Sequence, residues 1–293
     1  MSVSEELRVQ LATVEDELSR LKAEFDDLTL LYQATIEHGE AVEDQLAESN
    51  LELQQTQRRL SEELTEATNY IFSILPEPRV AAPRTQWLLV PSTELGGDSF
   101  GYHDIDADHI AFYLLDVCGH GVGAALLSVT AINVLRSAAL PNTDFRDPGA
   151  VLSSLNDAFP MERQNNMYFT IWYGVYQRSS GALRYASAGH PASILCKKEA
   201  QVLTLCTPGI AIGMMPEMSY RGGHCVIESG DRLHLVSDGT FEVETAPGEM
   251  LSFNDFVERL SRADSPGEVL EWVRSLNGSG PLPDDFSLLT IDF

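Results

Sequence analysis

Residues 109–127 read HIAFYLLDVCGHGVGAALL, and the rest of the architecture can be built outward from them. The first nine residues are almost continuously apolar, which is typical of a strand buried on both faces. Asp116 lies at the end of this run, and Gly119-His120-Gly121 forms a turn. Small residues from Val122 to about Ala139 then follow a helical pattern. The order strand, turn, helix indicates a domain of mixed α and β structure.

Hairpin signals on the C-terminal side of this stretch favour antiparallel sheets. The segment 178–181, Arg-Ser-Ser-Gly, separates two apolar runs, as turns between paired strands do. Helix starts lie between the blocks of strands: Asp147-Pro148 combines an N-cap with Pro at the first helical position, and residues 265–268 form a capping box. This pattern predicts an α+β layered sandwich rather than a doubly wound parallel sheet.

The first 75 residues are predicted to form a coiled-coil dimerisation and regulatory helix. Residues 1–78 contain 18 of the 44 acidic residues and only 5 of the 19 basic ones. Apolar residues keep one heptad phase along this segment, which makes two helices supercoil and bury a narrow seam. The residues of this seam are Leu7, Leu11, Val14, Leu18, Leu21, Phe25, Leu28, Tyr32, Val42, Leu46, Leu53, Leu60, Ala67, Tyr70 and Ile74. We therefore expect a parallel homodimer.

The alternative for the N-terminal segment is a helical hairpin folded back at His38-Gly39. Gly weakens a helix by about 1 kcal/mol relative to Ala, but the heptad phase continues unbroken across it. Pro76, Pro78 and Pro83 then mark residues 76–85 as a junction, because Pro ends helices. Residues 86–293 are predicted to form the second domain.

Charge and cysteine usage limit the partners and the compartment. The formal net charge is −25, and such a surface repels nucleic acid and anionic membranes. The four cysteines have no CxxC spacing, which favours reduced thiols and a reducing compartment. The acidic start lacks the pattern of a signal peptide, and no apolar run reaches the ~18 residues of a membrane span. A cytoplasmic location is expected.

Four acidic turns follow or precede apolar strands. They are Gly96-Gly97-Asp98, the turn from Asp116 to Gly121, Ser237-Asp238-Gly239-Thr240 and Asp284-Asp285-Phe286-Ser287. Any one of them alone is ordinary turn chemistry. Together, they can form a cage of hard oxygen ligands for Mg²⁺ or Mn²⁺. Two such ions sharing a carboxylate and a water make a site for phosphoryl transfer.

The ordered set GGD, DVxGHGxxAALL, YASAGHP, SDG and DDxS resembles the PPM metal-dependent protein phosphatases, in particular the bacterial SpoIIE/RsbU-type branch. The resemblance runs from about Leu75 to Phe293. It implies an α-β-β-α sandwich with two Mn²⁺ or Mg²⁺ ions per active site. It also implies hydrolysis of phosphoserine or phosphothreonine on a partner protein, often a STAS-type anti-sigma-factor antagonist in a partner-switching pathway.

The resemblance also implies roles for particular residues. Asp98 and Asp238 match metal ligands, Asp116 matches the bridging aspartate, and the Val117 carbonyl would complete one shell. Asp284 aligns with the last ligand, and Asp285 is the alternative.

The two motif histidines are interpreted separately, and both roles of His120 stay open. His120 would either orient water or act as a general acid, or else fill a Gly-rich turn. His190 of the GHP motif is interpreted as closing a strand. The chain departs from the family pattern after Asp98, where no further Asp follows to hold a third metal. Arg79 and Arg221 are the candidates for gripping phosphate.

Two other functions and one mode of control follow from these patterns as hypotheses. The domain could be a dimeric phosphoprotein-binding scaffold without catalysis, or it could hydrolyse a small phosphate ester or nucleotide. If the domain is a phosphatase, coil packing or a bound partner would set the position of the helix that enters the junction at residues 71–75, and this helix would in turn set the position of the metal-binding turns.

Overall fold

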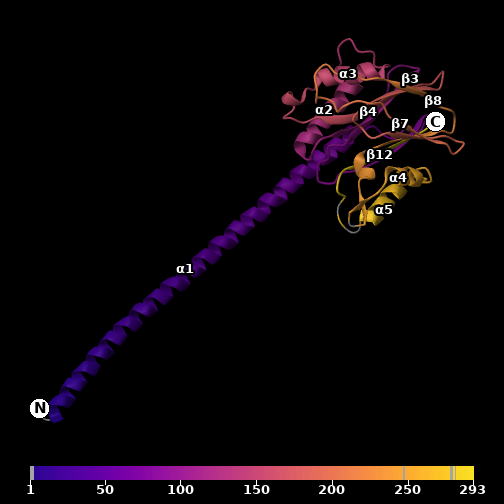
Figure 1. Ribbon diagram of the computed structural model, residues 1–293. Coiled ribbons are helices and arrows are strands. Elements are labelled where there is room, and N and C mark those ends of the chain that lie inside the picture. Colours follow the sequence, from indigo (N-terminus) through magenta and orange to yellow (C-terminus); the bar gives the residue numbers. More distant parts are fainter. Residues whose placement is uncertain (1–2, 247, 278–279, 281) are drawn as a thin grey trace. The chain divides into compact units, whose positions relative to one another are not determined.

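The computed structural model describes residues 3–246, 248–277, 280 and 282–293, and the chain divides into one unit up to Glu63 and a second from Leu64 to Phe293 (Figure 1). Helix α1 runs from Val3 to Ile74 as a single 72-residue element. Its last turns therefore belong to the second unit. The helix continues through Gly39, which confirms the prediction of one long helix and excludes the hairpin.

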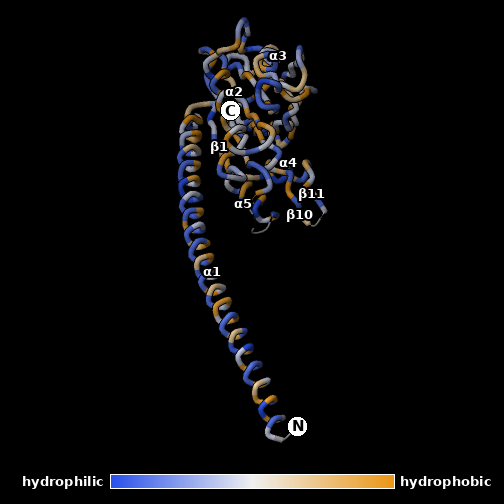
Figure 2. The backbone as a smooth tube through the Cα atoms, turned by 90° about the vertical axis from the view of Figure 1, so that its left-hand side faces the viewer, coloured by the Kyte–Doolittle hydropathy of each residue, from blue (hydrophilic) through white to orange (hydrophobic). Residues whose placement is uncertain are grey.

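Seam residues of α1 in the first unit are exposed, whereas Ile74 at the end of the helix is partly buried. Leu21 and Phe25 are 67% and 68% exposed, and Leu53 is 55% exposed. Figure 2 shows hydrophobic residues recurring along α1 among predominantly hydrophilic ones. An apolar stripe of this kind on an acidic helix marks an interaction surface, and the coiled-coil homodimer stays a prediction. Among the described helices, none combines the length and the apolar character needed to cross a bilayer.

Two five-stranded antiparallel sheets form the centre of the second unit. The first sheet has the order β1-β12-β9-β6-β7, and the second has the order β2-β3-β4-β5-β8. Every pairing within them is antiparallel, as the hairpin signals predicted. The strands of the first sheet are β1 (Arg84–Val90), β12 (Phe286–Asp292), β9 (Arg232–Val236), β6 (Ser193–Cys196) and β7 (Val202–Leu205). Those of the second are β2 (Ser99–Asp104), β3 (His109–Val117), β4 (Phe169–Gln177), β5 (Ala182–Ala188) and β8 (Gly223–Val226).

Helices cover the outer face of each sheet, so the layers are α-β-β-α, as predicted (Figure 1). Helices α2 (Val122–Arg136) and α3 (Pro148–Ala158) pack on the second sheet, and α4 (Phe253–Leu260) and α5 (Pro266–Asn277) pack on the first. Side chains such as Phe112, Trp172 and Leu289 fill the space between the sheets and are fully buried. A small hairpin of β10 (Glu244–Ala246) and β11 (Glu249–Met250) lies outside these layers.

The antiparallel pairing explains how distant acidic turns reach one end of the sandwich. An antiparallel pair places the start of one strand beside the end of its neighbour. In the second sheet, Ser99 at the start of β2 pairs with Leu115 near the end of β3. In the first sheet, the start of β12 lies beside the end of β9, where the Ser237 N–H donates to the Ser287 carbonyl at 3.0 Å. Each sheet therefore contributes two of the four turns.

Candidate metal centre

Carboxylates from three of the acidic turns line one open pocket of about 360 Å³. Asp116 comes from the end of β3, Asp238 follows β9, and Asp284 precedes β12. His120 and Val117 line the same pocket. The structure therefore brings together most of the residues that the sequence predicted for the site.

The carboxylates are close enough to perturb one another. Burial first, and then the charges of Asp238, Asp284 and Asp285, raises the pKa of Asp116 to about 7. Burial, together with the charges of Asp284 and Glu242, raises the pKa of Asp238 as well. Like charges that crowd together in a partly desolvated site favour either protonation or a bound cation. The electrostatics of the pocket are those of a site that lacks positive charge.

Asp98 is not part of the pocket lining but lies close to Asp116, and it is only 5% exposed. Its Oδ2 atom has no hydrogen-bond partner in the part of the chain that the structure describes. Burial and then the neighbouring Asp116 raise its pKa well above the ordinary value, and the hydroxyls of Ser287 and Ser237 oppose this rise in part. A buried carboxylate oxygen without a partner is costly unless a cation or water satisfies it.

Asp285 has a different environment from the other aspartates, because both of its oxygens accept hydrogen bonds from the loop that carries Asp98. Oδ1 accepts from the Ser92 N–H at 2.7 Å and the Ser92 hydroxyl at 2.9 Å. Oδ2 accepts from the Gly97 N–H at 2.7 Å and the Asp98 N–H at 3.4 Å. Asp285 thus holds the GGD turn in place, whereas Asp284 faces the pocket. The sequence offered Asp285 only as the alternative ligand and gave no signal of this role.

The two glycines of the GGD turn are required by close approach. A Cβ atom at Gly96 would overlap the Asp285 carboxylate, and one at Gly97 would lie 2.5 Å from the Val117 carbonyl oxygen. Only residues without a side chain allow this backbone to sit against both groups. The turn therefore draws together the ends of β2, β3 and β12.

The two histidines of the motifs lie in different environments. His120 is exposed at the pocket, between Gly119 and Gly121, which both have positive φ. His190 is buried, and its Nδ1 lies 2.8 Å from the Thr170 hydroxyl. Thr170 pairs directly with Asp116 across β3 and β4. Burial lowers the pKa of His190 to about 3, so the ring is neutral and supports the pocket wall from behind.

No Lys or Arg lines the pocket among the residues that the structure describes. Arg79 pairs with Asp104 at 3.5 Å, and Arg221 lies exposed elsewhere, so neither candidate for gripping phosphate is part of the lining. A cluster of carboxylates with an unpartnered buried oxygen and no basic side chain fits hard divalent cations.

The pocket does not form a complete metal-coordination sphere. Within the described ranges, no three acidic, histidine or cysteine side chains already converge as a metal-binding group. Mg²⁺ in particular is commonly held by one or two carboxylates and retains several waters. An open cluster of carboxylates is therefore compatible with such an ion.

Comparisons with known proteins agree with this fold and pocket. The family model described as Stage II sporulation protein E (SpoIIE) matches residues 106–293. Phosphoserine phosphatase RsbU of Bacillus subtilis (strain 168) is 27% identical over 279 residues, covering 91% of this chain and 79% of RsbU. Phosphoserine phosphatase RsbP of the same organism is 25% identical, covering 52% of this chain and 38% of RsbP.

Two solved structures share the fold at lower sequence identity. The SiaA-PP2C domain of Pseudomonas aeruginosa superposes with a TM-score of 0.70 at 22% identity, covering 81% of this chain and 98% of that domain. RsbX, solved in complex with magnesium, gives a TM-score of 0.54 at 16% identity, covering 73% of this chain and 98% of RsbX. Similarity at this level of identity shows the fold alone.

Proposed function

Since the chain belongs to the SpoIIE family of PP2C-type phosphatases, we propose that it is a metal-dependent hydrolase of phosphoserine or phosphothreonine on a partner protein. The observation that carries this proposal is the pocket lined by Asp116, Asp238 and Asp284, with no basic side chain in its described lining. A phosphate group would be repelled from these carboxylates unless cations intervened. These three aspartates lie in the part of the chain that the family model covers.

In this proposal, two Mn²⁺ or Mg²⁺ ions would be held by Asp116, as the shared ligand, together with Asp98, Asp238, Asp284 and the Val117 carbonyl. When bound, such ions lower the pKa of water and offset the negative charge of a phosphoryl group. The protein itself supplies orientation, because Asp285 fixes the turn that carries Asp98.

His120 is proposed to donate a proton to the departing serine or threonine oxygen. Support comes from its exposure and its position in the pocket lining. Histidine is the side chain that most often serves as a general acid or base in catalysis.

The test is phosphate release from a panel of phosphoserine peptides and a panel of nucleotides, each with and without Mn²⁺. We expect release from the phosphopeptides that depends on Mn²⁺, because the pocket has no fixed positive charge of its own in its described lining. Release from nucleotides alone would identify a small-phosphate hydrolase. Binding of phosphopeptides without any release would identify a non-catalytic scaffold. Either result would overturn the proposal.

The proposed substrate is a phosphorylated STAS-type protein of a partner-switching pathway, and the proposed location is the cytoplasm. Support comes from the match to RsbU and RsbP, which are named phosphoserine phosphatases. The chain spans 79% of RsbU but only 38% of RsbP, so the similarity to RsbP concerns one part of that protein.

We further propose that α1 forms a parallel coiled-coil homodimer that regulates the phosphatase. The last turns of α1 already contact the domain: the Thr68 hydroxyl donates to the Glu94 carbonyl at 2.6 Å, and Arg136 donates to the Ile74 carbonyl at 3.1 Å. Glu94 comes shortly before the GGD turn. A change in the packing of the coil could therefore be transmitted to Asp98 through Thr68 and Glu94.

Leu53→Asp is expected to weaken the dimer at least a hundredfold. Leu53 lies on the seam and is 55% exposed in the single chain. Burying one leucine contributes roughly 1.5–3 kcal/mol, and the dimer has two copies, so about 3 kcal/mol or more is lost. At 1.4 kcal/mol per tenfold, this is about a hundredfold in the dissociation constant. Sedimentation equilibrium of the full chain measures it.

Leu51→Asp is the matched control, because Leu51 is 57% exposed and lies off the seam. Equal dissociation constants for the two variants would argue against this seam. The same pair also tests regulation. If monomeric Leu53→Asp had the turnover and the partner response of Leu51→Asp, the coil would not control the phosphatase.

A further inference from the structure

A second polar pocket, of about 260 Å³, lies on the helix-facing side of the second sheet. His109, Val175, Gln177 and Arg184 come from β3, β4 and β5, and they form its floor. His109 begins the strand that carries Asp116 near its other end, and the seven-residue separation corresponds to about 23 Å. The pocket is therefore remote from the candidate metal centre.

The wall of this pocket is the loop before α3, which carries Asp144 and Arg146. The Tyr173 hydroxyl donates to the Phe145 carbonyl at 3.0 Å, and the Phe145 side chain is buried in the core. Asp144 in turn accepts from the Arg146 Nε at 2.9 Å and from the Arg146 N–H at 3.0 Å. The loop and its guanidinium group are thus held in position before any ligand arrives.

Arg184 provides the pocket with a guanidinium group that is not engaged by another described residue. It is exposed, and its guanidinium has no hydrogen bond or ion pair among the residues that the structure describes. Its backbone pairs with Val175 on one side and with His224 on the other, so no acidic residue lies directly beside it in the sheet. In a chain of net charge −25, an arginine without a carboxylate partner is available for an external anion.

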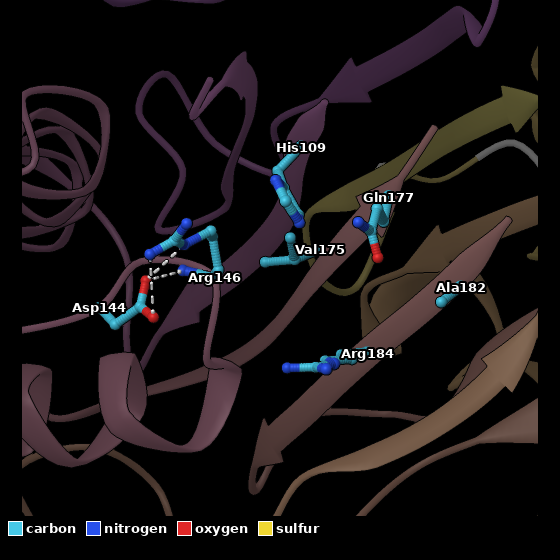
Figure 3. A pocket seen from close by; sticks show the side chains of 7 residues that line it. All are labelled: His109, Asp144, Arg146, Val175, Gln177, Ala182 and Arg184. Carbon is cyan, nitrogen blue, oxygen red and sulfur yellow. Dashed lines mark hydrogen bonds and ion pairs between the residues drawn. The ribbon is translucent and has the colours of Figure 1, made fainter. Parts of the chain in front are cut away.

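The side chains that line the pocket include more guanidinium groups than carboxylates. Two guanidinium groups line it against one carboxylate, that of Asp144, which Arg146 already engages. His109 bonds through Nδ1 to both oxygens of Asp106, at 2.9 and 3.0 Å, and its Nε2 has no partner in the described chain. Figure 3 shows His109, Arg146 and Arg184 on three different sides of Val175, with the Arg146 guanidinium turned toward Asp144.

We propose that this pocket binds a single phosphomonoester group or free phosphate. Guanidinium groups match phosphate oxygens in forked pairs, and a phosphate dianion offers three acceptor oxygens to donors that approach from several sides. A carboxylate has only two oxygens in one plane and would leave one donor unused. The volume lies below the ~300 Å³ at which pockets for drug-sized ligands begin, which favours a small head group over a whole nucleotide.

The test uses the full chain in EDTA, so that the metal centre does not bind phosphate. Calorimetric titrations at constant ionic strength use three probes: inorganic phosphate, acetyl-Gly-phosphoSer-Gly-amide and acetyl-Gly-Glu-Gly-amide. The variant is Arg184→Glu, with Arg184→Gln as a milder second variant. The control is Arg274→Glu, because Arg274 is exposed on α5 over the other sheet and has no partner among the described residues.

We expect both phosphate probes to bind the wild type and Arg274→Glu, and to bind Arg184→Glu at least tenfold more weakly. Tighter binding of the phosphopeptide would identify a phosphorylated side chain as the source, and tighter binding of the free ion would identify inorganic phosphate. Equal affinities in Arg184→Glu and Arg274→Glu, or equally tight binding of the glutamate peptide, would overturn the assignment. Mn²⁺-dependent turnover of p-nitrophenyl phosphate should be unchanged in Arg184→Glu, which separates this pocket from the metal centre.

Discussion

Asp116→Asn is expected to lower Mn²⁺-dependent phosphate release by about a thousandfold or more. Asn has nearly the same shape but carries no negative charge, and Asp116 lies among Asp238, Asp284 and Asp98 at the centre of the acidic cluster. If Asp116 is the shared ligand, as proposed, its replacement would weaken the binding of both cations at once. A metal ion contributes several kcal/mol of charge stabilisation in the transition state, and about 4 kcal/mol corresponds to a thousandfold in rate.

The matched control for this variant is Asp157→Asn. Asp157 is exposed on α3, outside the pocket lining, and makes no hydrogen bond within the described chain. Its replacement removes one negative charge without touching the site. The measurement is initial rate against Mn²⁺ concentration for both variants, with circular dichroism to verify the fold. If the two variants released phosphate at the same rate, the assignment of the metal centre would be wrong.

Asp116→Asn is also expected to stabilise the metal-free protein. The pKa of Asp116 is raised to about 7 from an ordinary value of 3.8, so between these two pH values the folded state binds more protons than the unfolded state. The free energy of unfolding therefore falls as pH rises through this window. At 1.36 kcal/mol per unit, the loss amounts to about 4 kcal/mol at most above pH 7.

In EDTA, Asp116→Asn should thus unfold at higher denaturant concentration than the wild type at pH 8, and the difference should shrink toward pH 4. Saturating Mn²⁺ should restore the stability of the wild type at pH 8, because the cation replaces the proton as the source of positive charge. A metal-free wild type whose stability did not change between pH 4 and 8 would contradict the crowding of carboxylates in this pocket.

The sequence predicted the layers and most of the pocket because both depend on local patterns. Uninterrupted apolar residues from Ile110 to Leu115 predict a buried strand, and an Asp directly after such a run lies at a strand end. The heptad phase across Gly39 predicted a continuous helix, which α1 confirms. Short elements gave weaker signals: α4 has only eight residues, too few for a helical period to stand out.

Long-range partners could not be read from the sequence in the same way. The hydrogen bond from the Gly97 N–H to Asp285 joins residues 188 positions apart, and nothing near either residue specifies the other. The pocket around Arg184 also depends on register, because His109, Gln177 and Ala182 share it only through the pairing of β3, β4 and β5. Charge patterns identify candidate residues, but strand register decides which of them meet.

Asp285→Asn is expected to lose stability, whereas Asp284→Asn is expected to lose activity. Asp285 is buried and uses both oxygens to accept hydrogen bonds from Ser92, Gly97 and Asp98. Asn would keep one acceptor and turn an amide NH₂ toward backbone N–H groups, which leaves buried donors unsatisfied. Each unsatisfied group costs about 1–3 kcal/mol, so a loss of about 3–5 kcal/mol is expected. For a domain of this size, that lowers the melting temperature by roughly 10 °C.

Asp284 is exposed at the pocket, and its one described hydrogen bond is from the neighbouring Asp285 N–H at 2.7 Å, which Asn can still accept. Asp284→Asn should therefore melt within about 2 °C of the wild type in EDTA, while its Mn²⁺-dependent rate falls at least tenfold because a proposed ligand is lost. Thermal melts and Mn²⁺ titrations of the two variants separate the roles. The reverse pattern, with Asp285→Asn stable but inactive and Asp284→Asn fully active, would make Asp285 the ligand. The two residues are adjacent, and in both variants Asp is replaced by Asn, which has the same shape. A difference between the variants therefore reflects the different directions in which the two carboxylates point.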